Sequence, residues 1–159
     1  TLLDIGSGSG TIGLEALRLR PKLKLISIDK RFGSQLLVAE NAKKLGVSPN
    51  KIIESDIKQF INNDLENIFS DFNRVIIGGC DKETKIKIIE EFSKFLEKGD
   101  IIVLPIITYE VLQKVSNYLR QLNYETSMNL IQTFKGISIS EGTRFEPNNP
   151  VFIIKAKKK

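Results

Sequence analysis

The sequence predicts an α/β fold in which a largely parallel sheet carries helices on both faces and ends in an antiparallel pair of strands. Three observations lead to this prediction. Apolar segments of strand length alternate with amphipathic helical segments along residues 2–122, and a glycine-dense turn joins the first strand to the first helix. Residues 125–155 then contain two strand-like segments with no helical pattern between them.

Repeats of one strand and one helix account for residues 2–122. Pro21 ends the first helix near Arg20, and Gly46 ends the second, because proline and glycine interrupt helices. The predicted strands are 2–5, 23–28, 51–55, 74–77 and 101–107. The predicted helices are 11–20, 34–45, 84–96 and a segment that follows Thr108 and carries Val111, Leu112, Val115, Leu119 and Leu122, together with a weaker helix that contains Phe60, Ile61, Leu65 and Ile68.

The turn after the first strand fits two nucleotide-binding templates. Residues 8–13 match G-x-G-x-x-G, the dinucleotide fingerprint, and Asp29 follows at about the distance expected of a ribose-binding acid. The glycines at positions 6, 8 and 10, preceded by Asp4, instead resemble the acid-x-G-x-G-x-G motif of Rossmann-like methyltransferases, which use S-adenosylmethionine. In both templates glycine tolerates the turn's backbone angles and lets a ligand approach the main chain. The turn alone does not decide between them.

The C-terminal segments favour the second template. Residues 125–134 and 150–155 are predicted strands, and two strands joined without a crossover helix pair antiparallel. A seven-stranded sheet of order 3-2-1-4-5-7-6 with the last strand antiparallel is the methyltransferase architecture. A dinucleotide-binding domain more often continues with a sixth parallel strand and its helix. Asp4 points the same way, since the residues before the glycines of a dinucleotide fold are normally apolar.

Composition excludes some functions and favours others. The chain of 159 residues is predicted to form a single domain, 1–159, and has no apolar segment long enough to span a membrane. It has no histidine, which excludes a Ser-His-Asp hydrolase or a His-ligated zinc enzyme. Its single cysteine, Cys80, permits no internal disulfide and suits a cytoplasmic location. A net charge of +5 favours an anionic partner, although part of it lies in residues 155–159, predicted to be a solvated tail.

The chain begins inside its first predicted strand and without an initiator methionine. A strand needs something to cover its sheet and to close its pocket. We therefore expect an upstream segment, including one that covers the ligand.

Several candidate site residues follow the predicted strands, where ligands of open α/β sheets bind. The glycine turn, with Ser7 and Ser9 between its glycines, is expected to cradle the cofactor's amino-acid portion. Asp4 is placed either to hold this turn or to meet the cofactor's ammonium group. Asp29 ends the second strand and is predicted to accept hydrogen bonds from both ribose hydroxyls, the alternative being a helix cap. The residues predicted to bind the cofactor are Asp4, Gly6, Ser7, Gly8, Ser9, Gly10, Asp29, Asp56, Ile57 and Gly78.

The third and fourth strands end in further candidates. Asp56 is predicted either to bond an adenine amino group, with Ile57 packed against the ring, or to cap the following helix. Gly78 and Gly79 follow the fourth strand, where a methyl acceptor would meet the sulfonium, and a plain turn explains them equally well. Cys80 is predicted to be a half-buried bystander.

Taken together, these motifs resemble those of the decarboxylating precorrin-6Y methyltransferases of cobalamin synthesis, in their small-subunit form. The resemblance covers nearly the whole chain. It is carried by Leu3-Asp4-Ile5-Gly6-Ser7-Gly8-Ser9-Gly10, Ile28-Asp29-Lys30, Glu54-Ser55-Asp56, Val75-Ile76-Ile77-Gly78-Gly79, Leu96-Glu97-Lys98-Gly99, Thr108-Tyr109-Glu110 and Asn149-Pro150-Val151. The double glycine, the Thr-x-Glu and the Asn-Pro-Val are its more specific parts.

The resemblance implies an activity, a cofactor and partners. Members of the family bind S-adenosylmethionine, methylate a corrin-ring methine carbon, are associated with loss of an acetate carboxyl, and are commonly homotetramers. The implied substrate is a precorrin, a tetrapyrrole with many carboxylates, which suits a basic protein; a membrane or nucleic-acid partner is not expected. Gly79, Glu110 and Arg144 are the candidates for contact with the acceptor, and Arg144 and Lys135 are candidate carboxylate clamps.

Departures from the family pattern keep other acceptors open. The glycine-rich continuation after the fourth strand is here Cys80-Asp81-Lys82, and the stretch before Thr108 is Leu104-Pro105-Ile106-Ile107. One alternative is a methyltransferase that acts on RNA or protein, although no Asn/Asp-Pro-Pro-Tyr motif follows the fourth strand and no aromatic residues interleave a basic stripe. Another is a non-catalytic nucleotide-binding subunit. A third is a dinucleotide oxidoreductase, although the chain shows no set of catalytic acids and bases for that reaction.

Overall fold

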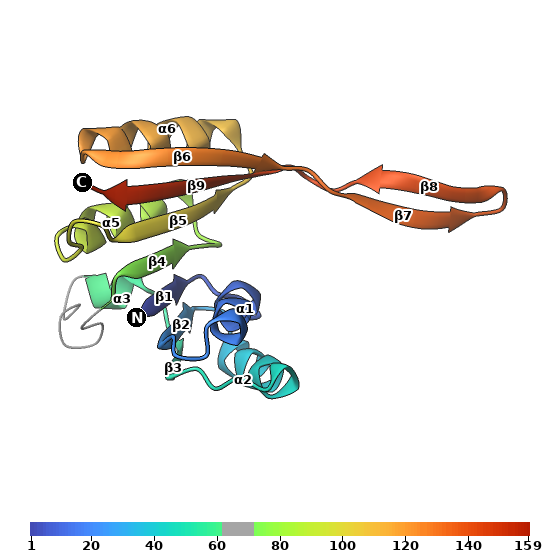
Figure 1. Cartoon of the computed structure of the whole chain (residues 1–159), viewed down its shortest axis with the longest axis horizontal. Coiled ribbons are helices and arrows are strands. Elements are labelled where there is room, and N and C mark those ends of the chain that lie inside the picture. The colour runs from blue at the N-terminus through green and yellow to red at the C-terminus, as the bar shows by residue number, and fades with distance from the viewer. Residues whose placement is uncertain (62–71) are drawn as a thin grey trace.

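The computed structural model describes residues 1–61 and 72–159, so the part of the weaker predicted helix at Leu65 and Ile68 lies outside the described residues. Its main sheet has seven strands in the order β3-β2-β1-β4-β5-β9-β6 (Figure 1). They are β1 Leu2–Ile5, β2 Leu25–Asp29, β3 Lys51–Glu54, β4 Arg74–Ile77, β5 Ile101–Ile106, β6 Tyr124–Ile131 and β9 Val151–Lys158. Strands β1 to β5 pair parallel, and β9 pairs antiparallel with both neighbours. The predicted strand order and antiparallel last strand are confirmed.

The helices cover the two faces of this sheet, as predicted. They are α1 Thr11–Leu19, α2 Ser34–Leu45, α3 Lys58–Ile61, α5 Lys82–Ser93 and α6 Tyr109–Gln121. Side chains of a strand alternate between faces, so neighbouring residues enter different cores. Leu3 of β1 lies in a core with α5 and α6, whereas Leu2 lies in a second core with α1 and α2. Among the described helices, none is long and apolar enough to cross a membrane.

The segment between β6 and β9 departs from the prediction. Residues 125–134 were expected to form one strand, but β6 ends at Ile131, and Phe134 begins a separate antiparallel hairpin. The hairpin consists of β7, Phe134–Ile139, and β8, Gly142–Pro147, which form a two-stranded sheet of their own and extend well away from the main sheet (Figure 1). The sequence pattern missed the hairpin because its strands do not alternate cleanly between apolar and polar residues.

The lysine-rich C-terminus was predicted to be a solvated tail, and this prediction is wrong. Residues 155–158 belong to β9, which lies between β5 and β6 in the sheet. Ala156 is fully buried and pairs with Ile102 and Thr126, while the flanking Lys155 and Lys157 are exposed. Alternation of Lys with a small residue therefore marks a strand with one buried face.

Candidate functional site

The glycine turn after β1 adopts a backbone that glycine favours. Gly6, Gly8 and Gly10 have φ angles of 68°, 61° and 78°, in the left-handed region that L side chains rarely adopt. The amide of Gly6 donates to the carbonyl oxygen of Ile28 at 2.8 Å, which ties the turn to the end of β2. Gly10 immediately precedes α1, so the first amides of this helix face the turn. The turn has the form of an anion- and nucleotide-binding loop.

Asp4 holds this turn from behind. Its side chain is 2% exposed, and its Oδ2 accepts a hydrogen bond from the Gly13 amide at 3.1 Å. Burial raises the pKa of Asp4 to about 6, the Gly13 amide opposes that shift, and the charge of Asp29 adds to it. A Cβ at Gly13 would lie 2.7 Å from Asp4 Oδ2 and 2.9 Å from Leu25, so Gly13 is a packing glycine. Of the two roles predicted for Asp4, the structure contains the first.

Asp29 joins the end of β2 to the glycine turn. Its Oδ2 accepts from the Gly8 amide at 2.7 Å, and its Oδ1 accepts from the Arg31 amide at 2.9 Å. Burial works to raise the pKa of Asp29, but hydrogen bonds from the Arg31 and Gly8 amides and from the Arg31 side chain hold it below its ordinary value. Asp29 does not cap α2, because Gly33 occupies the N-cap position. It is a charged carboxylate at the rim of the turn.

Arg31 is a neighbour of the turn that the sequence pattern did not single out. Its Nε lies 3.3 Å from Asp29 Oδ1, and one terminal nitrogen lies 2.3 Å from the point at which a Cβ of Gly8 would stand. The guanidinium therefore rests against the outer side of Gly8, although most of the side chain is exposed. A carboxylate followed two residues later by arginine is the signal for this local pair.

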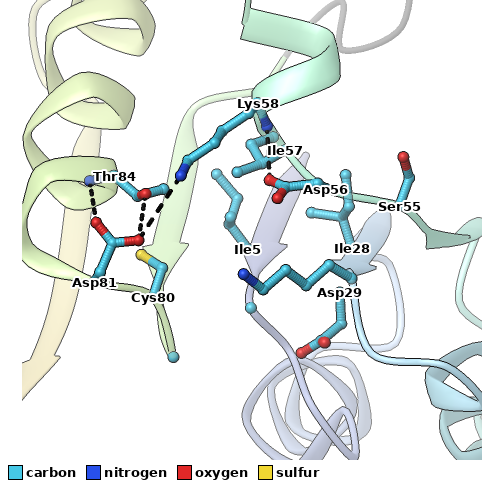
Figure 2. Close-up of a pocket in the computed structure, with 13 residues that line it drawn as sticks. Ile5, Ile28, Asp29, Ser55, Asp56, Ile57, Lys58, Cys80, Asp81 and Thr84 are labelled. Atoms are coloured by element: carbon cyan, nitrogen blue, oxygen red, sulfur yellow. Dashed lines mark hydrogen bonds and ion pairs between the residues drawn. The ribbon is translucent and has the colours of Figure 1, made fainter.

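The segment after β3 forms the adjoining wall of the site. The Asp56 Oδ1 accepts from the Lys58 amide at 3.0 Å, which places Asp56 at the start of α3, the capping role considered for it. The same side chain lines the pocket of Figure 2, as does Ile57, which is 6% exposed. The cap leaves the second carboxylate oxygen available to a ligand.

An ion pair crosses the pocket from this wall to the opposite one. Figure 2 shows Lys58 extending toward Asp81, and Lys58 Nζ lies 3.9 Å from Asp81 Oδ2. Asp81 also caps α5, accepting from the Thr84 amide at 2.9 Å and from the Thr84 hydroxyl at 2.6 Å. These bonds lower the pKa of Asp81 to about 2. The sequence did not predict this pair because its members follow different strands.

The two glycines after β4, Gly78 and Gly79, have different surroundings, which bears on the two explanations offered for them, room for a methyl acceptor and a plain turn. A Cβ at Gly78 would lie 2.8 Å from the Gly6 carbonyl oxygen, so Gly78 has no room for a side chain. A Cβ at Gly79 would meet nothing within 4 Å, so this residue faces open space. Cys80 is a free, half-buried thiol, as predicted, and burial raises its pKa against the influence of Lys85. Gly78 serves the turn, whereas Gly79 leaves the pocket open.

These segments enclose one pocket at the carboxyl ends of β1, β2, β3 and β4. Its empty space, including the open mouth, is about 370 Å³, within the range of small-molecule sites. Of the predicted residues, Gly6, Asp29, Asp56, Ile57 and Gly79 line it. Lys30, Lys58 and Asp81 line it as well and were missed.

The remaining predicted residues lie around or beyond this pocket. Ser7, Gly8, Ser9 and Gly10 complete the turn behind Gly6, and among the described residues the buried Ser7 hydroxyl has no hydrogen-bond partner. Glu110 lies in the first turn of α6, after β5. Arg144 and Lys135 lie on the projecting hairpin, and Arg144 pairs with Glu146 of its own strand. The structure of one chain does not bring these last two to the pocket.

Three comparisons place the chain among known proteins. The family model of the precorrin methyltransferase domain matches residues 1–158. A probable cobalt-precorrin-6B C(15)-methyltransferase (decarboxylating) of Sulfurisphaera tokodaii is 29% identical over 157 residues, which cover 98% of this chain and 79% of that protein. The cobalt-precorrin-6B C(15)-methyltransferase (decarboxylating) of Salmonella typhimurium is 24% identical, with 99% of this chain and 78% of the relative covered.

A solved structure agrees in fold. The precorrin-6Y C5,15-methyltransferase of Geobacter metallireducens superposes with a TM-score of 0.83 at 26% identity, and the match covers 99% of this chain and 80% of that chain. The family model, the strand order and the glycine turn beside an acidic strand end all agree. The chain belongs to the precorrin methyltransferase domain family.

Proposed function

We propose that this protein transfers a methyl group from S-adenosylmethionine to a ring carbon of a precorrin, with associated loss of an acetate carboxyl group. The observation that carries the proposal is the link between the glycine turn and the Asp29 carboxylate through the Gly8 amide, in a member of this family. That link places a charged acceptor directly beside a turn whose backbone is open to a ligand.

The residues of the pocket suit the cofactor. The Asp29 carboxylate has about four lone-pair positions and receives three donors here, from Gly8 and Arg31, so it retains capacity for a ribose hydroxyl. The Ser7 hydroxyl is buried in the turn behind Gly6 and has no partner among residues 1–61 and 72–159, and it remains a proposed contact of the polar amino-acid portion. Ile57 offers an apolar surface to the adenine ring, and Asp56 a free carboxylate oxygen to its amino group.

The chemistry needs little from the protein beyond placement. When bound, S-adenosylmethionine supplies an electrophilic methyl group on its sulfonium sulfur. An electron-rich ring carbon can attack that group directly, so positioning is the main contribution and the absence of histidine is no obstacle. Gly79, with open space at its Cα, leaves room for the ring at the end of β4. Glu110 at the start of α6 and Arg144 remain proposed contacts of the acceptor.

We also propose that the protein is a homo-oligomer, with a tetramer as the form that the family resemblance implies. A two-stranded hairpin alone is marginally stable in water, yet β7–β8 extends away from the sheet (Figure 1). Phe134 and Phe145 occupy the same face of this hairpin and are 59% and 69% exposed. A second copy of the chain would cover this apolar face, as it would Leu130 and Ile131 at the end of β6.

Calorimetry on the full-length protein tests the cofactor. We expect S-adenosylhomocysteine to bind with micromolar affinity and NAD not to bind. Tight binding of NAD without binding of S-adenosylhomocysteine would overturn the proposal, because it would assign the turn to a dinucleotide.

Turnover tests the acceptor. The protein is incubated with S-adenosylmethionine and a precorrin, and the product is examined by mass spectrometry. We expect the gain of one methyl group and the loss of one carbon dioxide, with a proton taking the place of the lost carboxylate. Methylation of RNA or protein instead, with the precorrin unchanged, would contradict the proposed acceptor.

A further inference from the structure

Lys85 is a buried cation in an unfavourable position. It lies in the first turn of α5 and is 6% exposed. The N-terminal end of a helix dipole disfavours a positive charge, and burial removes the hydration of the ammonium group. Among the described residues no carboxylate forms an ion pair with it, since Asp81 bonds Thr84 and Lys58 instead. A group with these costs needs a compensating role.

The Lys85 ammonium group is directed at the turn after β4. Its Nζ donates a hydrogen bond to the carbonyl oxygen of Gly78 and lies 3.6 Å from the Sγ of Cys80. The Cys80 amide donates to the same carbonyl oxygen at 2.9 Å. The Cys80 thiol supplies no negative charge to Lys85, because burial raises its pKa. The Gly78 carbonyl therefore accepts from a cation and from an amide at once.

Two donors on one carbonyl polarise the peptide group to which it belongs. Hydrogen bonds in a chain strengthen one another, so a cation on the Gly78 oxygen makes the amide of Gly79 a stronger donor. The Gly78–Gly79 peptide is trans, and in a trans peptide the N–H points away from the C=O. The Gly79 N–H thus points away from Lys85.

The Gly79 amide lies beside the glycine turn that follows β1. The Gly79 nitrogen stands 2.9 Å from the point at which a Cβ of Gly6 would be, and Gly6 and Gly79 both line the pocket. In the part of the chain that the structure describes, no acceptor is paired with the Gly79 amide. A polarised donor without a partner among the described residues therefore lies at a residue that lines the pocket.

We propose that the Gly79 amide, polarised by Lys85 through the Gly78 carbonyl, binds a carboxylate oxygen of a ligand in the pocket. Lys85 is then a positioning residue that acts through the peptide and does not touch the ligand. This inference rests on the proposed function, which offers two sources of the carboxylate: the amino-acid portion of the cofactor and the side chains of the tetrapyrrole. An anionic oxygen is the common requirement.

The test compares variants of Lys85 with ligands that carry or lack the carboxylate. Lys85→Met removes the charge and keeps the length, Lys85→Arg keeps the charge, and Lys87→Met removes an exposed lysine of the same helix as a control. Calorimetry measures the Kd of S-adenosylhomocysteine, which has the carboxylate, and of 5′-methylthioadenosine, which lacks the amino-acid portion. Steady-state kinetics measure KM and kcat for the precorrin.

If the Gly79 amide binds the carboxylate of the cofactor, Lys85→Met raises the Kd of S-adenosylhomocysteine about tenfold and leaves the Kd of 5′-methylthioadenosine unchanged. A carboxylate of the acceptor predicts unchanged Kd values and a KM about tenfold higher, with kcat nearly constant. In either case Lys85→Arg keeps most of the affinity of the unchanged protein, and Lys87→Met leaves the affinity unchanged.

Two results would overturn the inference. One is an equal loss of affinity for both nucleosides, which a merely distorted turn would produce; the other is no change in either Kd or in KM. Should Lys85→Met fail to fold by circular dichroism, Lys85→Arg and Lys85→Gln carry the same comparison, because both keep a donor and only the first keeps the charge. If the unchanged protein binds no S-adenosylhomocysteine, the proposed function fails instead.

Discussion

The backbone nitrogen of Gly79 lies 2.9 Å from the position that a Cβ of Gly6 would occupy. The Gly6 carbonyl oxygen lies equally close, at 2.8 Å, to the position of a Cβ on Gly78. The turn after β1 and the turn after β4 therefore pack backbone against backbone, and the Gly78 amide donates to the Ile5 carbonyl oxygen at 2.7 Å. This contact connects the proposed cofactor side of the pocket to the proposed acceptor side.

Replacing Gly6 with alanine tests the contact. Gly6→Ala strains a left-handed residue and also drives a Cβ into the backbone of Gly78 and Gly79. Gly33→Ala is the matched control, since Gly33 has a φ of 79° but open space around its Cα. We expect Gly33→Ala to lower the free energy of unfolding by about 1–2 kcal/mol and Gly6→Ala by clearly more. Urea denaturation measures both, and equal losses would show that the contact is unimportant.

The raised pKa of Asp4 predicts how the free energy of unfolding depends on pH. Its pKa of about 6 in the folded protein lies above its ordinary value of 3.8, so between these values the folded state binds more protons than the unfolded state. Stability from this group is therefore full below pH 4 and is lost as the pH rises through 6, by roughly 3 kcal/mol. We expect the stability of Asp4→Asn, relative to the unchanged protein, to increase by up to that amount from pH 4 to pH 7.

Urea denaturation at several pH values checks this expectation. Asp4→Asn keeps an oxygen for the Gly13 amide and does not titrate, so the difference between the two proteins isolates the Asp4 carboxyl group. A difference that stays constant between pH 4 and pH 7 would contradict the raised pKa.

Asp29 is expected to control cofactor affinity. Asp29→Ala removes the acceptor of the Gly8 and Arg31 amides and the proposed ribose contact, so the Kd of S-adenosylhomocysteine should rise by about tenfold to a hundredfold. Glu54→Gln is the control, because Glu54 pairs with Asp29 across β2 and β3 but is exposed. Calorimetry measures both variants. If Asp29→Ala binds as tightly as Glu54→Gln, the ribose assignment is wrong.

The projecting hairpin should determine the oligomeric state. The double substitution Phe134→Ser and Phe145→Ser removes the two exposed aromatic rings from one face of β7–β8. We expect the unchanged protein to form an oligomer at micromolar concentration and the double variant to dissociate toward monomers, as measured by light scattering after gel filtration. Phe32→Ser, at a fully exposed phenylalanine before α2, should leave the mass unchanged. A monomeric unchanged protein would refute the proposed oligomer.

Short-range patterns explain why the main sheet was predictable. In β1 and β4, Leu2 and Ile76 enter one core while Leu3 and Ile77 enter the other, so strands buried on both faces appear as continuous apolar runs. The glycine turn and Asp29 were also visible, because each follows its own strand directly and needs only local geometry.

Other parts of the structure were not predicted, for different reasons. The terminal lysines look like a solvated tail until Ala156 is seen between β5 and β6. The hairpin at residues 134–147 is a local pairing of two strands, but its apolar and polar residues do not alternate, so no pattern in the sequence indicated it. Lys58 and Asp81 follow different strands, so their ion pair forms only in the folded sheet. Lys85 is buried because α5 folds back onto the turn after β4, where Lys85 bonds the Gly78 carbonyl oxygen.

The order of strands and helices, the glycine turn and the acidic strand ends could be predicted from the sequence alone, because periodicity and backbone preference act over a few residues. Which of these groups share a pocket depends on how the strands assemble into the sheet. The sheet packs Gly6 against Gly79, because contacts between residues far apart in the chain form only when the ends of β1 and β4 come together.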